Sequence, residues 1–288
     1  MLRGRLFSKS GAVWTLAIAL VCSRADAASC VWKVTGPNGG MLYLGGSIHA
    51  LRSTDYPLPS AYNRAFDASS RLVFEEDPKT GSAAFRDFVK AGQYPKGDSL
   101  KNHVDPRTYE YLRHFFALAK VPEEKFSRLR PWYIDVLLAM PPVQYYQLGV
   151  EYFLVRRARA NSKPMSGLES SKEHYQSFVG LSDRDSEAVL LVFFINAGRE
   201  TSHEVNMLDA WRHGDADLIA HAAHEEFRDF PAMAERVYGQ RNHNWIPKIE
   251  NYLRSDQIYF VVVGAAHMGG PDGLLTLLRS RGCKIEQL

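Results

Sequence analysis

The stretch "IYFVVVGAAHMGG", residues 258–270, decides the fold class of this chain. Its apolar run ends at Gly264, and His267 follows three positions later. Near the other end of the chain, "MLYLGGSIHA" (41–50) repeats the plan, with His49 three positions after Gly46. A short apolar run bounded by glycine is typical of a buried strand that ends in a tight loop. The repeated pattern predicts that the two ends of the chain contribute strands to one sheet.

The other predicted strands also lie near the chain ends, and predicted helices fill the middle. Strand 257–263, helix 271–281 and strand 283–288 form a β-α-β unit, whose strands a right-handed crossover would make parallel. We expect one α/β domain over 28–288, with a mixed sheet and a large helical insertion over roughly 79–256. The remaining predicted strands are 30–35, 41–49, 71–77 and a short one within 163–170, and the helical patterns are 60–69, 105–120, 130–140, 150–161, 183–213 (one long or two abutting helices) and 214–256, with a break at Phe230-Pro231.

Residues 1–27 are expected to be a signal peptide rather than part of the fold. Three basic residues precede the apolar run "AVWTLAIALVC" (12–22), and "ADA" (25–27) offers small residues for cleavage. The run is short for a bilayer span, so we expect export to the periplasm or beyond, without stable membrane insertion after cleavage. An uncleaved anchor is the alternative.

Removing that segment changes the charge of the chain. Residues 1–27 hold four basic residues and one acidic residue, which accounts for the whole net charge of +3. The rest of the chain is therefore neutral overall, and no basic stripe indicates a nucleic-acid partner.

Cys30 and Cys283 stand at opposite ends of the predicted domain. In an exported protein two cysteines can form a disulfide, which requires their Cα atoms to lie within about 7 Å. Two buried, unpaired thiols are the alternative.

Three apolar segments end in residues that can carry chemistry. They lead to His49, to the acidic run Glu75-Glu76-Asp77 and to His267. Ligands of open α/β sheets bind beyond the carboxyl ends of parallel strands, so we expect these side chains to meet there. Two histidines and a carboxylate are typical ligands of Zn, Mn, Fe or Co sites that keep a position for water. Glycine at the tips would allow unusual backbone dihedrals and leave room for a ligand.

Other interpretations of these residues remain open. The histidines can be ordinary loop or core residues, and the acidic run can be a solvated loop or a helix cap. His221 and His224 share a helix face, which we expect to be solvated. Ser47 lies near His49 and is expected to satisfy local backbone groups, and no Gly-x-Ser-x-Gly elbow occurs.

Several further blocks carry a family resemblance. The successive blocks resemble the TraB/GumN family in order and rough spacing over nearly the whole predicted domain. The two Gly-x-x-His motifs around an acidic strand end are the most specific part. The blocks are "LYLGGSIHALRSTDYPLP" (42–59), "LVFEEDP" (72–78), "RPW" (130–132), "KPMSGLES" (163–170), "RNHNW" (241–245) and "VVVGAAHMGGPDGLLTLLRSRGCKIEQL" (261–288).

The resemblance implies both a fold and an activity. Animal Tiki proteins of this group are metal-dependent proteases that cut Wnt proteins, and erythromycin-esterase-like and haem-binding ChaN-like proteins are proposed distant relatives. It implies a divalent metal (Mn, Co, Zn or Fe) held by His49, His267 and Glu75, and a peptide or protein substrate. Glu76 departs from the apolar residue usual between the acids, so either Glu75 or Glu76 can be the ligand.

The remaining roles follow from the same resemblance. Glu76 or Asp77 would act as general base or orient a ligand histidine, and Arg241 would stabilise an oxyanion. Glu169 is expected in a supporting role. The rival functions are a non-catalytic periplasmic haem- or metal-binding protein and an interaction protein.

Overall fold

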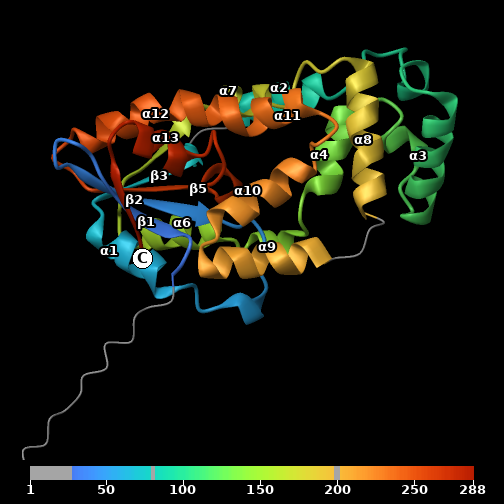
Figure 1. Cartoon of the computed structure of the whole chain (residues 1–288). Coiled ribbons are helices and arrows are strands. Elements are labelled where there is room, and N and C mark those ends of the chain that lie inside the picture. Colours follow the sequence, from blue (N-terminus) through green and yellow to red (C-terminus); the bar gives the residue numbers. More distant parts are fainter. Residues whose placement is uncertain (1–27, 79–81, 198–201) are drawn as a thin grey trace, which may run out of the picture.

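The predicted α/β fold is confirmed. The computed structural model describes residues 28–78, 82–197 and 202–288 (Figure 1). Six strands form one mixed sheet in the order β4-β3-β5-β2-β1-β6. The strands are β1 (Val31–Thr35), β2 (Met41–Ser47), β3 (Arg71–Glu76), β4 (Met165–Glu169), β5 (Tyr259–Gly264) and β6 (Lys284–Gln287). The N- and C-terminal strands therefore share the sheet, as the repeated motif predicts.

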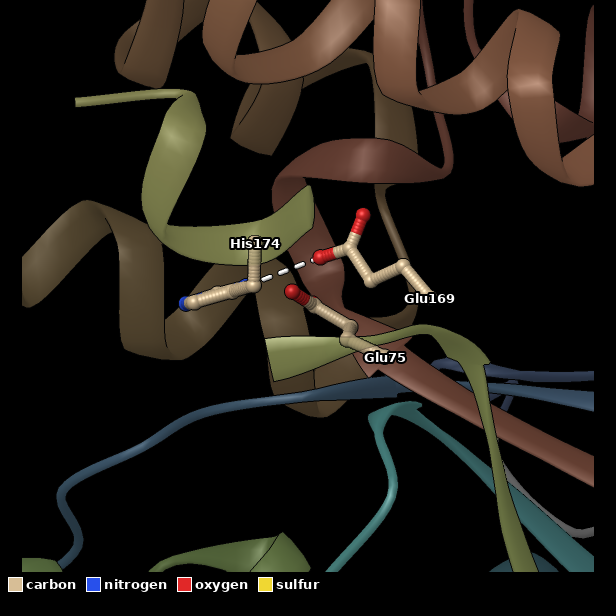
Figure 2. Close-up of side chains that lie close together, drawn as sticks. All are labelled: Glu75, Glu169 and His174. Atoms are coloured by element: carbon tan, nitrogen blue, oxygen red, sulfur yellow. Dashed lines mark hydrogen bonds and ion pairs between the residues drawn. The ribbon is translucent and has the colours of Figure 1, made fainter. Parts of the chain in front are cut away.

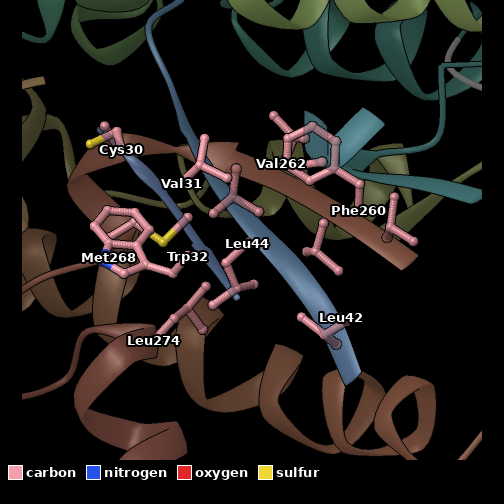
Figure 3. Packing of buried hydrophobic residues seen from close by; sticks show 14 of the residues in the cluster. Cys30, Val31, Trp32, Leu42, Leu44, Phe260, Val262, Met268 and Leu274 are labelled. Carbon is pink, nitrogen blue, oxygen red and sulfur yellow. The ribbon is translucent and has the colours of Figure 1, made fainter. Parts of the chain in front are cut away.

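Strand β5 is the centre of the sheet. It pairs in parallel with β2 on one side and with β3 on the other. Phe260, Val261, Val262 and Val263 have no exposed surface, because helices cover both faces of a parallel sheet. Burial of each such side chain contributes about 1.5–3 kcal/mol. Figure 3 shows Phe260 and Val262 among the buried side chains of β1 and β2.

Helices cover both faces of the sheet and form a lobe beside it. In Figure 1, α12 and α13 lie on one face, α1, α6 and α9 on the other, and α3, α4 and α8 in the lobe. The helices are α1 (Ser60–Ala68), α2 (Ser82–Ala91), α3 (Pro106–Leu118), α4 (Pro131–Ala139), α5 (Val143–Tyr146), α6 (Val150–Ala160), α7 (Ser171–Gln176), α8 (Asp183–Ala197), α9 (Ser202–His213), α10 (Ala216–Glu225), α11 (Pro231–Ala234), α12 (Gln240–Leu253) and α13 (Leu274–Ser280). A π-helical turn, Glu235–Gly239, leads into α12, and a 3-10 turn, Ala265–His267, follows β5.

Two details of the topology differ from the simplest expectation. The predicted short strand within 163–170 is confirmed as β4, but it interrupts the predicted helical insertion and is one edge strand of the sheet, so the helices fall into one group before β4 and another after it. Strands β5 and β6 run in the same direction but are not neighbours, because β1 pairs antiparallel with both β2 and β6. The predicted helical region 183–213 forms two helices, α8 and α9.

The sheet brings four strand ends together at the edge formed by the carboxyl ends of its parallel strands. Strands β4, β3, β5 and β2 are parallel and adjacent, so their carboxyl ends meet there. The glycines at the tips have no unusual dihedrals: Gly264 has φ −50° and ψ 136°, and Gly46 has a negative φ. The expectation that they permit a forbidden backbone is therefore wrong, and their role is to leave space.

Cys30 and Cys283 are buried free thiols. The antiparallel pairing of β1 with β6 makes the terminal strands neighbours, as a disulfide would need, but the two thiols are not joined. The predicted signal peptide lies outside the described residues. Within the part that is described, no helix has both the length and the apolar character needed to cross a bilayer.

Candidate functional site

Glu75 is the central acid at this edge of the sheet. It lies near the end of β3, and its side chain is 14% exposed. The backbone N–H of Gly264, at the tip of neighbouring β5, donates to Oε1 at 2.6 Å. Arg241 Nη2 donates to the other oxygen, Oε2, at 2.5 Å. Burial alone would raise the pKa of Glu75, but the positive charges of Arg241 and His49 outweigh it and hold the pKa well below its usual range.

Arg241 is the buried cation of the site. It lies in the first turn of α12, directly after the π-helical turn, a feature frequent at functional sites. Its guanidinium has five N–H bonds, and each finds an acceptor among the described residues. The acceptors are the carboxylates of Glu75 and Glu169, the carbonyl of Val237 and the ring of His267.

Glu169, at the end of β4, is the second acid paired with Arg241. Arg241 Nη2 lies 2.6 Å from Glu169 Oε1, and both side chains are almost fully buried. Trp245 Nε1 donates to Oε2 at 3.1 Å, and His174 Nδ1 lies 2.8 Å from Oε1. Burial raises the pKa of Glu169, but the bonds from His174 and Arg241 lower it further than burial raises it. Two acids and one arginine leave one net negative charge in this cluster.

His267 is buried and neutral. Burial is the main cause that lowers its pKa to about 3, and the positive charge of Arg241 lowers it further. Arg241 Nη1 lies 3.2 Å from Nε2, and Asn242 Oδ1 lies 2.7 Å from Nδ1. Since arginine can only donate, Nε2 accepts and Nδ1 carries the proton that it donates to Asn242. In this tautomer the Nε2 lone pair faces the site and accepts from Arg241.

His49 reaches the same place from the loop after β2. Its side chain is 60% exposed, and Nδ1 lies 2.8 Å from Glu151 Oε1 of helix α6. The negative charge of Glu151 is the main cause that raises the pKa of His49 to about 9. A Cβ added to Gly264 would lie 3.9 Å from His49 Nε2, 3.6 Å from His267 Cδ2 and 3.2 Å from Glu75 Oε1. The structure thus brings the two motif histidines and the strand-end glutamate together around Gly264.

The two acids that follow Glu75 lie differently. Glu76 accepts a hydrogen bond from the Ser171 hydroxyl, at the start of α7, so it does not share the partner of Glu75. Asp77 follows the end of β3, and its backbone N would lie only 2.3 Å from a Cβ on Gly167 of β4. Glu75 therefore binds Arg241, whereas Glu76, the register partner of Glu169 in β4, binds Ser171 instead.

The structure contains a candidate metal-binding group that the sequence did not indicate. Glu75, Glu169 and His174 each offer a ligand atom, and these atoms all lie within 4.8 Å of one another. Figure 2 shows the three side chains converging from β3, β4 and α7. Arg241 Nη2 is within hydrogen-bonding distance of both carboxylates and lies 3.1 Å from His174 Nδ1. A metal ion at the centre of this group would have to displace the arginine.

The second possible group is the one predicted from the motifs. His267 Nε2 lies 3.9 Å from Glu75 Oε1. Two ligands that are each about 2.1 Å from one metal ion lie no more than about 4.2 Å apart, so this pair fits. His49 Nε2 lies near the same point beside Gly264, so these three donors would have to draw closer together to share one metal ion. Such a metal would leave both Arg241–carboxylate pairs in place but would take the Nε2 lone pair of His267 from Arg241 Nη1.

Comparison with known proteins identifies the family. The family model described as the TraB/PrgY/gumN family matches residues 30–287. The chain belongs to this family. Two curated proteins of the same name, "Uncharacterized protein YbaP" from Escherichia coli (strain K12) and from Shigella flexneri, are each 22% identical to it over 254 residues. Each alignment covers 85% of this chain and 90% of the YbaP protein, and no solved structure matches.

Within this TraB/PrgY/gumN chain, three neighbours of the motif residues were not predicted. They are His174, Glu151 and Asn242. His174 and Glu151 lie on helices α7 and α6 rather than at strand ends marked by glycine, so the sequence offers no local signal for them. Asn242 stands beside Arg241 in "RNHNW", where helix geometry allows both side chains to contact His267.

Proposed function

We propose that this chain is an exported metal-dependent hydrolase that cuts peptide bonds. One observation supports it most: a glutamate, two histidines and a buried arginine converge where four parallel strands end, with one net negative charge in the carboxylate–arginine cluster. That arrangement attracts a cation to a place open to water, since His49 is largely exposed. The peptide substrate follows from the family resemblance.

The metal would be held by His49, Glu75 and His267. This choice leaves the Arg241 pairs with Glu75 and Glu169 in place, whereas a metal among Glu75, Glu169 and His174 would displace a buried cation. A divalent metal bound there supplies a Lewis acid and lowers the pKa of a water ligand.

The protein residues have separate tasks in this proposal. The positive charge of Arg241 keeps the buried carboxylates ionised. Because each of its N–H bonds already has an acceptor, Arg241 fits the role of a counter-ion better than that of an oxyanion donor. Asn242 fixes the tautomer of His267. Glu76, oriented by Ser171, is the general base we propose, with Asp77 as the neighbouring alternative.

Metal analysis of the purified full-length protein tests the proposal. We expect the wild type to take up metal from a mixture of Mn²⁺, Co²⁺, Zn²⁺ and Fe²⁺, and the His49→Ala, His267→Ala double variant to lose it. His174→Ala should retain the metal, as should the control His243→Ala, which changes a half-exposed histidine of the same helix as Arg241. Retention by the double variant with loss in His174→Ala would instead locate the metal among Glu75, Glu169 and His174.

Hydrolysis needs its own measurement. The metal-loaded protein should cleave a quenched-fluorescent peptide library, and a chelator should stop cleavage. Metal uptake without any cleavage would contradict the hydrolase proposal and favour a non-catalytic metal-binding protein. A Soret band that survives purification and disappears in His49→Ala would instead favour a haem-binding protein.

A further inference from the structure

Glu151 holds His49 from the side opposite the candidate metal site. It lies in the first turn of α6, and its Oε1 is 2.8 Å from His49 Nδ1. The side chain of Glu151 is 24% exposed, less than half the exposed fraction of His49. Because Nδ1 faces Glu151, the other ring nitrogen, Nε2, faces the space beside Gly264.

Ser47 binds the same carboxylate. Its hydroxyl donates to Glu151 Oε1, and the residue is 2% exposed at the end of β2. Ser47 therefore satisfies Glu151 rather than local backbone, which corrects the expectation from the sequence. The Ser47 hydroxyl donates its proton directly to the Glu151 carboxylate. We therefore assign Ser47 to stabilising this acid rather than to nucleophilic attack.

The backbone joins the two segments as firmly as the side chains do. Val150 N–H donates to the Ile48 carbonyl at 3.0 Å, and Leu51 N–H donates to the Tyr145 carbonyl at 3.2 Å. A Cβ on Gly149 would lie 2.2 Å from the carbonyl oxygen of His49, so only glycine allows this approach. The start of α6 therefore holds the loop that carries His49 in a fixed position.

We infer that Glu151, supported by Ser47, is a positioning residue that sets the ring orientation of His49 and directs Nε2 toward Glu75 and His267. The inference rests on the proposed function for its purpose. Metal-binding histidines usually donate their second nitrogen to a carboxylate or carbonyl, which fixes the tautomer and makes the ligand more basic. Loss of such a partner typically weakens metal binding 10–100-fold. Glu151 is not itself expected to touch substrate or metal.

Proton NMR of the metal-free protein tests the inference without any metal or substrate. We expect a downfield Nδ1–H signal of His49, assigned by its absence from His49→Ala. Glu151→Ala should abolish that signal, and Glu151→Gln, which keeps an acceptor oxygen, should retain it. The control Glu123→Gln, whose carboxylate accepts from Tyr109 in the helical lobe at 2.6 Å, should leave it unchanged.

Metal titration then separates the two hypotheses. With Mn²⁺ as the probe, Glu151→Ala should bind 10–100-fold more weakly than wild type, and Glu151→Gln should fall between them. If Glu151→Ala keeps the Nδ1–H signal, the positioning role is wrong. If the signal behaves as expected but the wild type binds no metal, the positioning role stands and the proposed function fails. If Glu151→Ala does not fold, Glu151→Asp, which shortens the side chain by one methylene, should displace the signal, and an unchanged signal would contradict the inference.

Discussion

Arg241 and Glu75 form an ion pair in which Nη2 lies 2.5 Å from Oε2, with side chains only 7% and 14% exposed. The same nitrogen binds Glu169, so one guanidinium pairs with acids from two neighbouring strands and offsets one of their two negative charges. Two carboxylates this close in a buried setting would otherwise repel each other and be poorly solvated. The site therefore depends on Arg241 for stability as well as for its charge.

Replacing Arg241 with methionine should destabilise the protein strongly. Arg241→Met keeps most of the volume but leaves two buried carboxylates without their cation, which typically costs about 3–5 kcal/mol of the free energy of unfolding. Urea denaturation of the metal-free protein measures this change. The control is Arg281→Met, which breaks a more exposed pair with Glu250 and should cost less than about 1 kcal/mol. Equal losses in the two variants would contradict the buried-counter-ion role.

The same substitution should create a second metal-binding site. Removing the guanidinium vacates the centre of Glu75, Glu169 and His174, whose ligand atoms already lie within 4.8 Å of one another. Arg241→Met should therefore gain a second Mn²⁺ or Zn²⁺ equivalent in a calorimetric titration. Adding His174→Ala to Arg241→Met should remove that extra equivalent. An unchanged stoichiometry in Arg241→Met would show that the group does not hold a metal even when it is vacant.

The pH dependence of stability should carry the signature of His267. Its folded pKa is about 3 against an ordinary value of 6.5, so between these values the unfolded chain binds a proton that the folded chain does not. Stability is therefore present above pH 6.5 and is lost as the pH falls, by about 1 kcal/mol per pH unit. Between about pH 5 and 6.5 Asp135, whose pKa burial raises to about 6, titrates with the opposite effect on stability, so the contribution of His267 is the difference between the wild type and a variant without that histidine.

His267→Gln should reduce this slope in the metal-free protein. Urea denaturation at several pH values in that window gives the free energy of unfolding of each variant. The slope, rather than the absolute stability, is the observable, because glutamine also changes the packing. His221→Gln, on the exposed face of α10, is the control and should leave the slope as in wild type. An identical slope in His267→Gln would show that His267 titrates normally in the fold.

The strand ends were the part of the site that the sequence could predict. Apolar runs that stop at glycine mark buried strands, and parallel strands deliver their tips to one edge, so His49, Glu75 and His267 could be expected together. The direct pairing of β2 with β5 comes from the structure, since the pattern predicts only that both strands belong to one sheet. The choice between Glu75 and Glu76 needed the register of β3, because one residue of slip exchanges the two faces.

The helical contributions could not be read from local patterns. Glu151 and His174 look like ordinary polar residues of amphipathic helices, and only the packing of α6 and α7 against strand ends gives them partners. The sequence singles out Arg241 only through the family resemblance, and the engagement of every N–H bond depends on how α12 packs against the strand ends. Long-range packing, rather than propensity, decides those positions.

Gly264 offers a way to close the site without straining the fold. Its dihedrals suit alanine, yet a Cβ there would lie 3.2 Å from Glu75 Oε1 and 3.9 Å from His49 Nε2, within the space proposed for the metal. Gly264→Ala should therefore lose Mn²⁺ uptake while its free energy of unfolding stays within about 1 kcal/mol of wild type. The matched control is Gly36→Ala. Its Cβ would make only ordinary van der Waals contacts, the nearest at 3.5 Å from Leu253, so this variant should keep the metal. Full metal uptake by Gly264→Ala would show that the metal lies elsewhere, because the added methyl group and a metal held jointly by His49 and Glu75 would compete for one volume.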